Sequence, residues 1–261
     1  MAREWDATEY EDVSSPQTRW GAKVLGRVAL RGDEAAMDAG CGTGRVTELL
    51  LERLPGGTVL AVDGSREMVA VARRRFAGDD RVRVERQDLL ELEVKEPVDL
   101  VFSTATFHWI KDHGRLFGRV ARALKPGGRL VAQCGGEGNI ARATRAMAEV
   151  MSEERFRPYF GGWSDEHYFA DVRSTKERLE AAGFVDVEVW LSDEPVTFES
   201  GEEFVRFLAT VVLGGHMRVL PEGERSGFAE AVAARIVAAE GDPLLDYVRL
   251  NMTATRSGSV A

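Results

Sequence analysis

The sequence contains only 2 cysteines and 4 histidines among its 261 residues. Cys41 and Cys134 cannot build a disulfide framework, and no cluster of cysteine and histidine has the spacing of zinc ligands. The sequence therefore predicts no bound metal, and we expect both cysteines to be small buried thiols.

Long apolar segments and an excess of positive charge are also missing. No apolar stretch approaches the roughly 20 residues that span a bilayer, and residues 1–10 carry no signal-peptide pattern. The 34 basic residues are outnumbered by 43 acidic residues, and the resulting net charge of −9 repels a polyanion unless basic groups cluster. We expect a cytoplasmic protein, monomeric or weakly dimeric, that binds neither nucleic acid nor a membrane.

The segment Ala35–Arg45 has the strongest local pattern in the chain. An apolar run stops at Asp38, and Gly40, Gly42 and Gly44 follow. This pattern predicts a buried strand, a tight turn and the start of a helix. Glycine is needed where φ is positive or where a ligand approaches the backbone, and a helix N-terminus presents unpaired N–H groups. The turn is therefore expected to hold a small polar ligand, although a turn without any ligand would use the same glycines.

The spacing of the glycines distinguishes between possible ligands. The dinucleotide pattern G-x-G-x-x-G would place its third glycine at Arg45, and so it fails. An acidic residue two positions before G-x-G-x-G is matched in full by Asp38 and the three glycines. This pattern resembles motif I of the class I S-adenosylmethionine-dependent methyltransferases. The resemblance implies a turn that approaches the methionine part of the cofactor, with Asp38 suited to its ammonium group.

Apolar strands and amphipathic helices alternate from Ala35 to Cys134, which predicts a parallel sheet with right-handed crossovers. We expect an α/β fold with a doubly wound, seven-stranded, mostly parallel Rossmann-like sheet and a helical cap inserted late in the chain. The expected strands are Ala35–Ala39, Thr58–Val62, Arg81–Glu85, Val98–Phe102, Arg129–Cys134, Val185–Leu191 and Tyr247–Thr255. The expected helices are Thr43–Leu54, Ser65–Phe76, Leu116–Leu124, Ile140–Met151, Thr175–Ala182, Glu202–Leu213 and Glu222–Ala239, preceded by helices within Trp5–Arg31.

Acidic residues follow three successive strands, where ligands bind in open α/β sheets. Asp63 can accept hydrogen bonds from both ribose hydroxyls, while Ser65 is expected to cap the next helix. In the family that the chain resembles, the position of Asp88 holds the adenine amine, and Lys125–Gly128 resembles the loop before the fifth strand. The resemblance implies S-adenosyl-L-methionine as cofactor, held by Asp38, Gly40, Gly42, Thr43, Gly44, Asp63, Gly64, Gln87, Asp88, Leu89 and Ser103.

The fourth expected strand is followed by F-H-W-I at residues 107–110. Together with Tyr10, Gln17 and a helical cap, this segment resembles the trans-aconitate and juvenile hormone acid methyltransferases, which esterify carboxylic acids. The resemblance implies that Gln17 and Trp109 hold the acceptor carboxylate. Their N–H groups are neutral donors that orient a carboxylate without neutralising its charge. A core aromatic or an exposed glutamine would be the structural alternative.

Beyond Gly135 the chain is expected to form the cap. Six aromatic residues there predict either a cover over an apolar pocket or a small hydrophobic core: Phe156, Tyr159, Phe160, Trp163, Tyr168 and Phe169. We expect the N-terminal helices and cofactor core in residues 1–137, a cap segment in 138–173, and the rest of the sheet with further cap helices in 174–261.

The predicted activity is methylation of a small-molecule carboxylic acid, which needs no general base because a carboxylate is already ionised at pH 7. Trans-aconitate would need several arginines, for which Arg19, Arg157 and Arg218 are candidates, whereas the aromatic residues favour a more apolar acid. The alternative activity is methylation of a hydroxyl or phenol with His108 as base. A cofactor-binding protein without catalysis is the third hypothesis.

Overall fold

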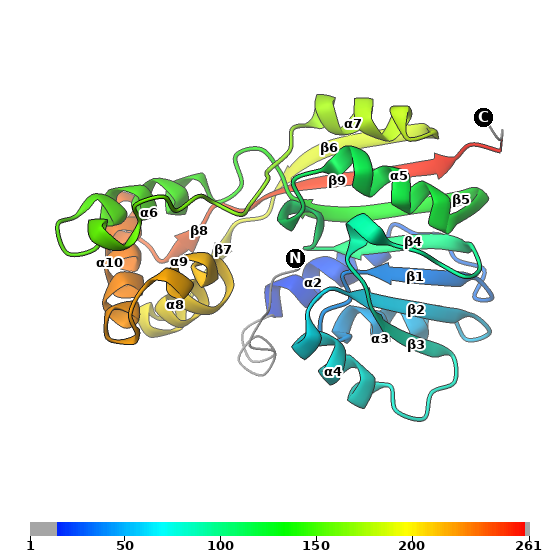
Figure 1. The fold of residues 1–261 in the computed structure, drawn as a ribbon, viewed down its shortest axis with the longest axis horizontal. Helices are drawn as coiled ribbons and strands as arrows, with labels where there is room; N and C mark the ends of the chain where they lie inside the picture. Colours follow the sequence, from blue (N-terminus) through cyan, green and yellow to red (C-terminus); the bar gives the residue numbers. More distant parts are fainter. Residues whose placement is uncertain (1–14, 259–261) are drawn as a thin grey trace. The chain divides into compact units, whose positions relative to one another are not determined.

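A seven-stranded sheet organises the computed structural model, which describes residues 15–258 (Figure 1). The strand order is β3-β2-β1-β4-β5-β9-β6, and the first five strands in this order are parallel to their neighbours. β5 and β6 lead out of the sheet into residues 138–167 and 192–249, whereas β9 leads back, so β9 runs antiparallel to both neighbours. The predicted fold class is confirmed. The strands are β1 (Ala35–Ala39), β2 (Thr58–Asp63), β3 (Val82–Arg86), β4 (Val98–Thr104), β5 (Leu124–Gly135), β6 (Phe184–Asp193) and β9 (Val248–Arg256).

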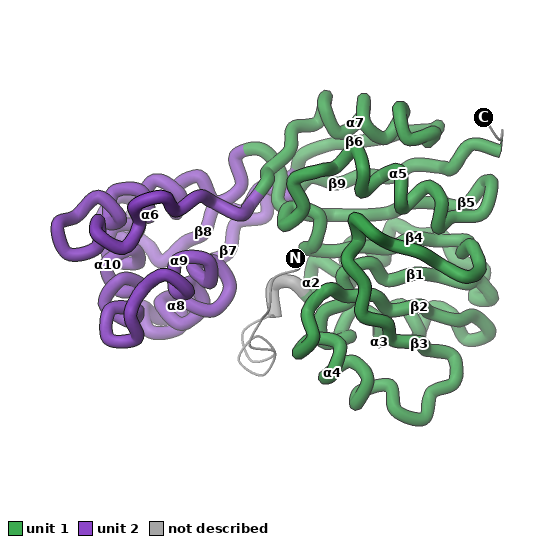
Figure 2. The backbone as a smooth tube through the Cα atoms, in the orientation of Figure 1, with its two compact units in different colours: residues 1–137, 168–191, 250–261 green, residues 138–167, 192–249 purple. Residues whose placement is uncertain are grey.

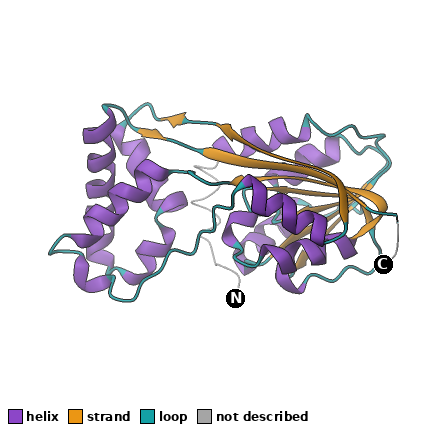
Figure 3. Cartoon of the chain, turned by 90° about the horizontal axis from the view of Figure 1, so that it is seen from above, coloured by secondary structure: helices purple, strands orange, loops and turns teal. Residues whose placement is uncertain are grey.

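Both faces of the sheet are covered by helices, as Figure 3 shows. Successive strand residues point to opposite faces, so Met37 joins a core with α5 and α7, while Ala36 joins a core with α2 and α3. This two-sided burial explains why the central strands β1 and β4 are mostly apolar. The helices of this part are α2 (Ser15–Leu25), α3 (Arg45–Glu52), α4 (Arg66–Arg75), α5 (His113–Ala123) and α7 (Val172–Ala181), with the 3₁₀-helices η1 (Leu89–Glu91) and η2 (Phe107–Trp109).

The helix starts follow from capping residues. The Ser65 hydroxyl accepts the N–H of Met68 at 3.3 Å, which confirms the predicted cap of α4. Asp112 accepts the N–H of Arg115 at 2.9 Å and starts α5 at His113, three residues before the predicted position. None of the helices within residues 15–258 combines the length and the apolar character of a membrane span.

Lys125–Gly128, predicted as a loop, lies within β5. The pairing of β4 with β5 runs from Val98 opposite Leu124 directly to Leu100 opposite Arg129, so these four residues form a bulge. Gly127 has a φ of 78°, which permits the bulge, and the Lys125 ammonium contacts both carboxylate oxygens of Asp99 at 2.9 Å. The sheet thus continues through a segment that reads locally as a turn.

The chain forms two compact units, coloured separately in Figure 2. Unit 1 comprises residues 1–137, 168–191 and 250–261 and contains the sheet, whereas unit 2 comprises residues 138–167 and 192–249. The predicted cap segment, residues 138–173, thus extends into unit 1 by its last six residues. Unit 2 contains α6 (Ala141–Ser152), the 3₁₀-helix η3 (Arg157–Tyr159), α8 (Gly201–Phe207), a π-helix (Leu208–Val212), α9 (Gly214–Val219), α10 (Glu222–Glu240) and the paired short strands β7 (Val196–Thr197) and β8 (Leu244–Leu245).

The six aromatic residues of the predicted cap divide between the units. Phe156 and Phe160 are buried in unit 2, with their ring centroids 5.2 and 5.3 Å from that of Phe228 in α10. Tyr168 and Phe169 belong to unit 1. The hydrophobic-core alternative therefore accounts for Phe156 and Phe160, and their rings no longer favour an apolar acceptor.

Candidate functional site

The glycine-rich turn joins β1 to α3 and is fixed to the end of β2. The Val62 carbonyl accepts the N–H groups of Gly40 and Cys41 at 2.8 and 3.0 Å. Gly40, Gly42 and Gly44 have φ values of 84°, 55° and 92°, a region that L side chains rarely adopt. The backbone of the turn therefore requires the glycines that the sequence supplies.

The three glycines have different surroundings. A Cβ on Gly40 would stand 2.1 Å from the Thr106 hydroxyl, and one on Gly44 would stand 2.5 Å from the Phe76 ring. A Cβ on Gly42 would meet no atom within 4 Å. The outer glycines are thus needed for packing, and the middle one leaves open space beside the backbone at the pocket described below.

Asp38 lies at the end of β1 and is 1% exposed. Its carboxylate accepts the Thr47 hydroxyl at 2.6 Å. Burial raises the pKa of Asp38 to about 7, with a further contribution from the negative charge of Asp63, against the opposing effect of the Thr47 hydrogen bond. A cationic group bound beside Asp38 would favour its ionised form.

Asp63 ends β2 and connects the turn to the start of α4. One carboxylate oxygen accepts the N–H of Gly42 at 3.0 Å, and the other accepts the N–H of Ser65 at 2.8 Å. A carboxylate oxygen can accept more than one hydrogen bond, so these contacts are compatible with the predicted ribose contact. Asp63 therefore shapes the glycine-rich turn in addition to its predicted role.

A pocket lies against this turn. Its lining includes Thr18 from α2, Arg45 and Val46 from α3, Thr104 and Ala105 after β4, and, from the turn itself, Asp38, Gly40, Cys41, Gly42 and Thr43. Burial is the main factor that holds the pKa of the Cys41 thiol well above its usual value, so this thiol stays protonated.

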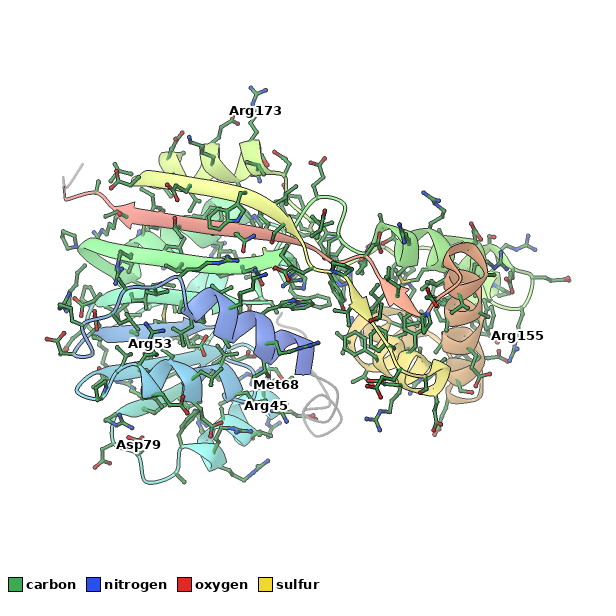
Figure 4. The ribbon with its side chains drawn as sticks, turned by 180° about the vertical axis from the view of Figure 1, so that it is seen from behind. Arg45, Arg53, Met68, Asp79, Arg155 and Arg173 are labelled. Carbon is green, nitrogen blue, oxygen red and sulfur yellow. The ribbon has the colours of Figure 1, made fainter. Side chains whose placement is uncertain are left out.

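Thr18, Arg45 and Ala105 were not predicted as site residues. Arg45, labelled in Figure 4, is the first residue of α3 and brings a positive charge to a pocket that also contains Asp38. Its position directly after the last glycine was the available sequence signal. Thr18 reaches the pocket because α2 approaches α3 closely, where a Cβ on Gly21 would stand 2.6 Å from Val46.

The predicted residues after β3 make local contacts. Asp88 caps η1 by accepting the N–H of Leu90 at 3.0 Å, and Leu89 is buried. The Gln87 amide group donates to Glu85 at 2.6 Å and to the Glu93 carbonyl at 3.1 Å. The Gly64 carbonyl accepts from Arg86 at 3.1 Å. These contacts explain the local structure, and the predicted adenine contacts of Gln87, Asp88 and Leu89 stay predictions.

At the end of β4 the pocket is lined by Thr104 and Ala105, the two residues after the predicted Ser103. Ser103 is 1% exposed, and its hydroxyl donates to the Ala39 carbonyl at 2.6 Å. Ala105 has a φ of 55°, an uncommon conformation for alanine, and its N–H donates to the Gln133 carbonyl at 2.8 Å. The backbone therefore turns sharply where it enters the pocket wall.

His108 and Trp109 follow in η2. Nδ1 of His108, which is 8% exposed, accepts the N–H of Gly135 at 3.2 Å. Because a backbone N–H can only donate, the neutral ring carries its proton on Nε2. The ring centroid of His108 lies 5.0 Å from that of Trp109 and 6.0 Å from that of Phe169. The segment that the sequence assigned to the acceptor is thus a packed aromatic group with a defined tautomer.

The remaining predicted residues belong to other segments of the chain or have side chains outside the described residues. Gln17 belongs to α2, but its side chain and the whole of Tyr10 lie outside the described residues. Arg19 is exposed in unit 1, whereas Arg157 and Arg218 are exposed in unit 2. Arg218 forms an ion pair with Glu166. Within unit 1, Arg19 is not among the residues that line the pocket, whereas Arg45 is.

The donor set fits a cofactor that combines a cationic amino acid with a nucleoside. Gly42 leaves space beside the backbone, Asp38 offers a buried carboxylate, and Asp63 offers acceptor oxygens at the next strand end. The positive end of α3 faces the same turn. These are the features that the sequence assigned to the methionine and ribose parts of the cofactor.

Known proteins to which this chain is similar include methyltransferases. A family model described as a methyltransferase domain matches residues 36–128. Trans-aconitate 2-methyltransferase of Rhizobium meliloti is 30% identical over 259 residues, with 97% of this chain and 99% of the relative covered. The enzyme of that name from Methylobacterium nodulans is 34% identical over 190 residues, with 72% and 67% covered.

A solved structure shares the fold. Phosphoethanolamine N-methyltransferase 2 of Haemonchus contortus, in complex with S-adenosyl-L-methionine, superposes with a TM-score of 0.63 at 23% identity. The match covers 96% of this chain and 56% of that one. At this identity the likeness concerns the fold alone.

Proposed function

Because this chain belongs to the S-adenosylmethionine-dependent methyltransferases, we propose that it methylates a carboxylate of a small molecule and produces a methyl ester. Two relatives named trans-aconitate 2-methyltransferase, one of them similar along nearly its whole length, support a carboxylate acceptor. Trans-aconitate is accordingly the first acceptor to test, followed by more apolar acids.

The cofactor supplies a methyl group activated by its positively charged sulfur. In this chain the turn Gly40–Gly44 and Asp63 would hold the cofactor, and Asp38 would face its ammonium group. The task of the remaining residues is to align a nucleophile with the methyl group and to exclude water, which together supply much of the rate of such a displacement. We assign the alignment of the carboxylate to Gln17 and Trp109.

The main observation in favour of a carboxylate acceptor is the tautomer of His108. Nδ1 accepts the N–H of Gly135, so the proton of the neutral ring resides on Nε2. This ring can donate a hydrogen bond from Nε2, but it can take up a proton only by losing the contact with Gly135. A hydroxyl or phenol acceptor requires a base, whereas a carboxylate is ionised already. The geometry of His108 therefore favours the carboxylate over the alternative acceptors.

The proposal predicts a methyl-transfer rate that is level from about pH 6 to 9, because a carboxylic acid with a pKa near 4 is fully ionised there. Single-turnover rates with trans-aconitate at saturating cofactor measure the chemical step without interference from product release. A base with a pKa near 6.5 would instead give a rate that rises across neutrality.

His108→Asn is the matched variant, because its side-chain oxygen can still accept the N–H of Gly135 while the amide cannot act as a base. We expect this variant to keep a level pH profile and to lose no more than about tenfold in rate, which is below the 10²–10⁴-fold contribution of a general base. A rise across neutrality in the wild type that disappears in His108→Asn would support the hydroxyl alternative instead.

A further inference from the structure

The 3₁₀-helix η2 carries Trp109, which is assigned to the acceptor, yet it spans only three residues. Within the segment, Trp109 N–H donates to the Thr106 carbonyl and Ile110 N–H donates to the Phe107 carbonyl, each at 3.0 Å. Short 3₁₀-helices have poorer hydrogen-bond geometry than α-helices. The orientation of Trp109 therefore depends on contacts from outside η2.

His113, the first residue of α5, provides such a contact. Its Nε2 lies 3.0 Å from the Phe107 carbonyl oxygen, which already accepts the N–H of Ile110. Because a carbonyl oxygen can only accept, Nε2 carries the proton and donates it. The imidazole is 1% exposed, so water does not compete for this hydrogen bond.

The ring of His113 also contacts Tyr168, a second residue that forms a hydrogen bond with the backbone of η2. Its centroid lies 4.9 Å from that of Tyr168, in an edge-to-face arrangement with an interplanar angle of 83°. The N–H of Tyr168 donates to the His108 carbonyl at 2.8 Å. His113 thus donates to the carbonyl of Phe107 and packs against the residue that holds the carbonyl of His108.

His113 is neutral, and its second ring nitrogen, Nδ1, is unfavourable for the stability of the folded protein. Burial is the main factor that lowers its pKa; Arg178 adds to the shift, whereas Asp112 and the Phe107 carbonyl oppose it. Nδ1 is buried and has no hydrogen-bond partner within residues 15–258. An unsatisfied buried acceptor is unfavourable, and a leucine would avoid it. The contact between Nε2 and Phe107 is the feature that a leucine could not reproduce.

We propose that His113 is a positioning residue that fixes η2, and thereby the orientation of Trp109 toward the acceptor. This inference rests on the proposed function in one respect, the assignment of Trp109 to acceptor binding. His113 contacts the η2 backbone and the Tyr168 ring, and it is not among the residues that line the pocket. Removal of its N–H donor therefore disturbs acceptor alignment and leaves cofactor binding unchanged.

The first test follows the environment of Trp109 without any substrate. The protein is labelled with 5-fluorotryptophan, and the ¹⁹F resonance of Trp109 is assigned by its loss in Trp109→Phe. In His113→Leu, which lacks a donor, this resonance shifts or broadens. In His113→Gln, whose side-chain N–H reaches a similar point, it stays close to the wild-type position. Because no turnover is measured, this result holds whether the acceptor is a carboxylate or a hydroxyl.

The second test measures the kinetics of the same variants with trans-aconitate. His113→Leu lowers kcat/KM for the acceptor by about 10- to 100-fold, the loss that a displacement near 1 Å causes, while the cofactor dissociation constant changes less than about twofold. His113→Gln restores kcat/KM to within about threefold of the wild type, since the donor is present again. Val120→Ala, a buried substitution elsewhere in α5, serves as control and changes neither kcat/KM nor the Trp109 resonance.

The proposal is overturned if His113→Leu leaves the Trp109 resonance and kcat/KM unchanged, or if His113→Gln loses as much as His113→Leu. Should His113→Leu fail to fold, the imidazole ¹⁵N shifts of the wild-type protein decide the question. They report an Nε2–H tautomer if His113 donates to Phe107, and an Nδ1–H tautomer would exclude that contact.

Discussion

Asp63→Ala is expected to raise the dissociation constant for S-adenosylmethionine by about 100-fold to 10,000-fold. Hydrogen bonds to a charged group contribute about 1.5–3 kcal/mol each, and the predicted ribose contact contains two of them. The substitution also removes the acceptors for the N–H groups of Gly42 and Ser65, which hold the glycine-rich turn against α4. Calorimetric titration with the cofactor measures the loss.

Asp33→Ala is the matched control for this experiment. Asp33 lies in the same unit, and its side chain is 70% exposed and paired with Arg31 at the surface. We expect its removal to leave cofactor binding unchanged, because exposed ion pairs contribute little. An Asp63→Ala protein that is folded, as judged by circular dichroism, and that binds the cofactor with the wild-type constant would contradict the ribose assignment.

Asp38→Asn is expected to stabilise the protein without cofactor while weakening cofactor binding. The pKa of Asp38 is raised to about 7 from 3.8 because the ionised carboxylate is buried. A raised carboxylate pKa costs no stability below pH 3.8, costs progressively more as the pH rises toward 7, and costs its full amount above 7. At 1.36 kcal/mol per pH unit, that full amount is on the order of 4 kcal/mol.

Asparagine has no charge to bury and keeps an oxygen that can accept the Thr47 hydroxyl. Thermal unfolding of the cofactor-free proteins at pH 5 and pH 8 tests this expectation. The variant should unfold at a temperature several degrees higher than the wild type at pH 8, at roughly 2–4 °C per kcal/mol for a chain of this size, and the difference should shrink at pH 5. Equal melting temperatures at pH 8 would show that Asp38 carries no buried charge.

The same substitution removes the charge that faces the cofactor's ammonium group. In the wild type, cofactor affinity should rise as the pH increases through about 7, because the ionised form of Asp38 is the one that attracts a cation. In Asp38→Asn the affinity should be lower and should not show this rise. Asp38→Asn is thus expected to increase the stability of the cofactor-free protein and to weaken cofactor binding, which is the usual trade-off between stability and function.

Much of the fold could be predicted because its signals are local. Apolar runs that end in acidic residues marked β1 and β2, and Ser65 marked the start of α4. The bulge at Lys125–Gly128 could not be predicted, because a proline and two glycines read as a turn unless the pairing with β4 is known. Likewise α9 could not be predicted, because it begins with Gly214 and Gly215, which are poor helix formers. Its helical conformation depends on packing within unit 2.

The site could be predicted where one segment supplies it and not where several segments meet. The glycine-rich turn contains its own signal, whereas Thr18 joins the pocket only because Gly21 lets α2 approach α3. His113 lies before the helix predicted at Leu116, and its contact with Phe107 had no sequence signal. The predicted aromatic cover illustrates the same limit, since Phe156 and Tyr168 belong to different units.

The proposal that the protein esterifies a carboxylate is tested most directly by the chemical stability of the product. The protein is incubated with cofactor labelled in the transferable methyl group and with trans-aconitate, apolar monocarboxylic acids or phenols, and the products are then treated with mild alkali. Methyl esters hydrolyse under these conditions, so we expect label that was transferred to an acid to be released as volatile methanol. Label that is transferred only to phenols or hydroxyl compounds, and that resists alkali, would contradict the proposal.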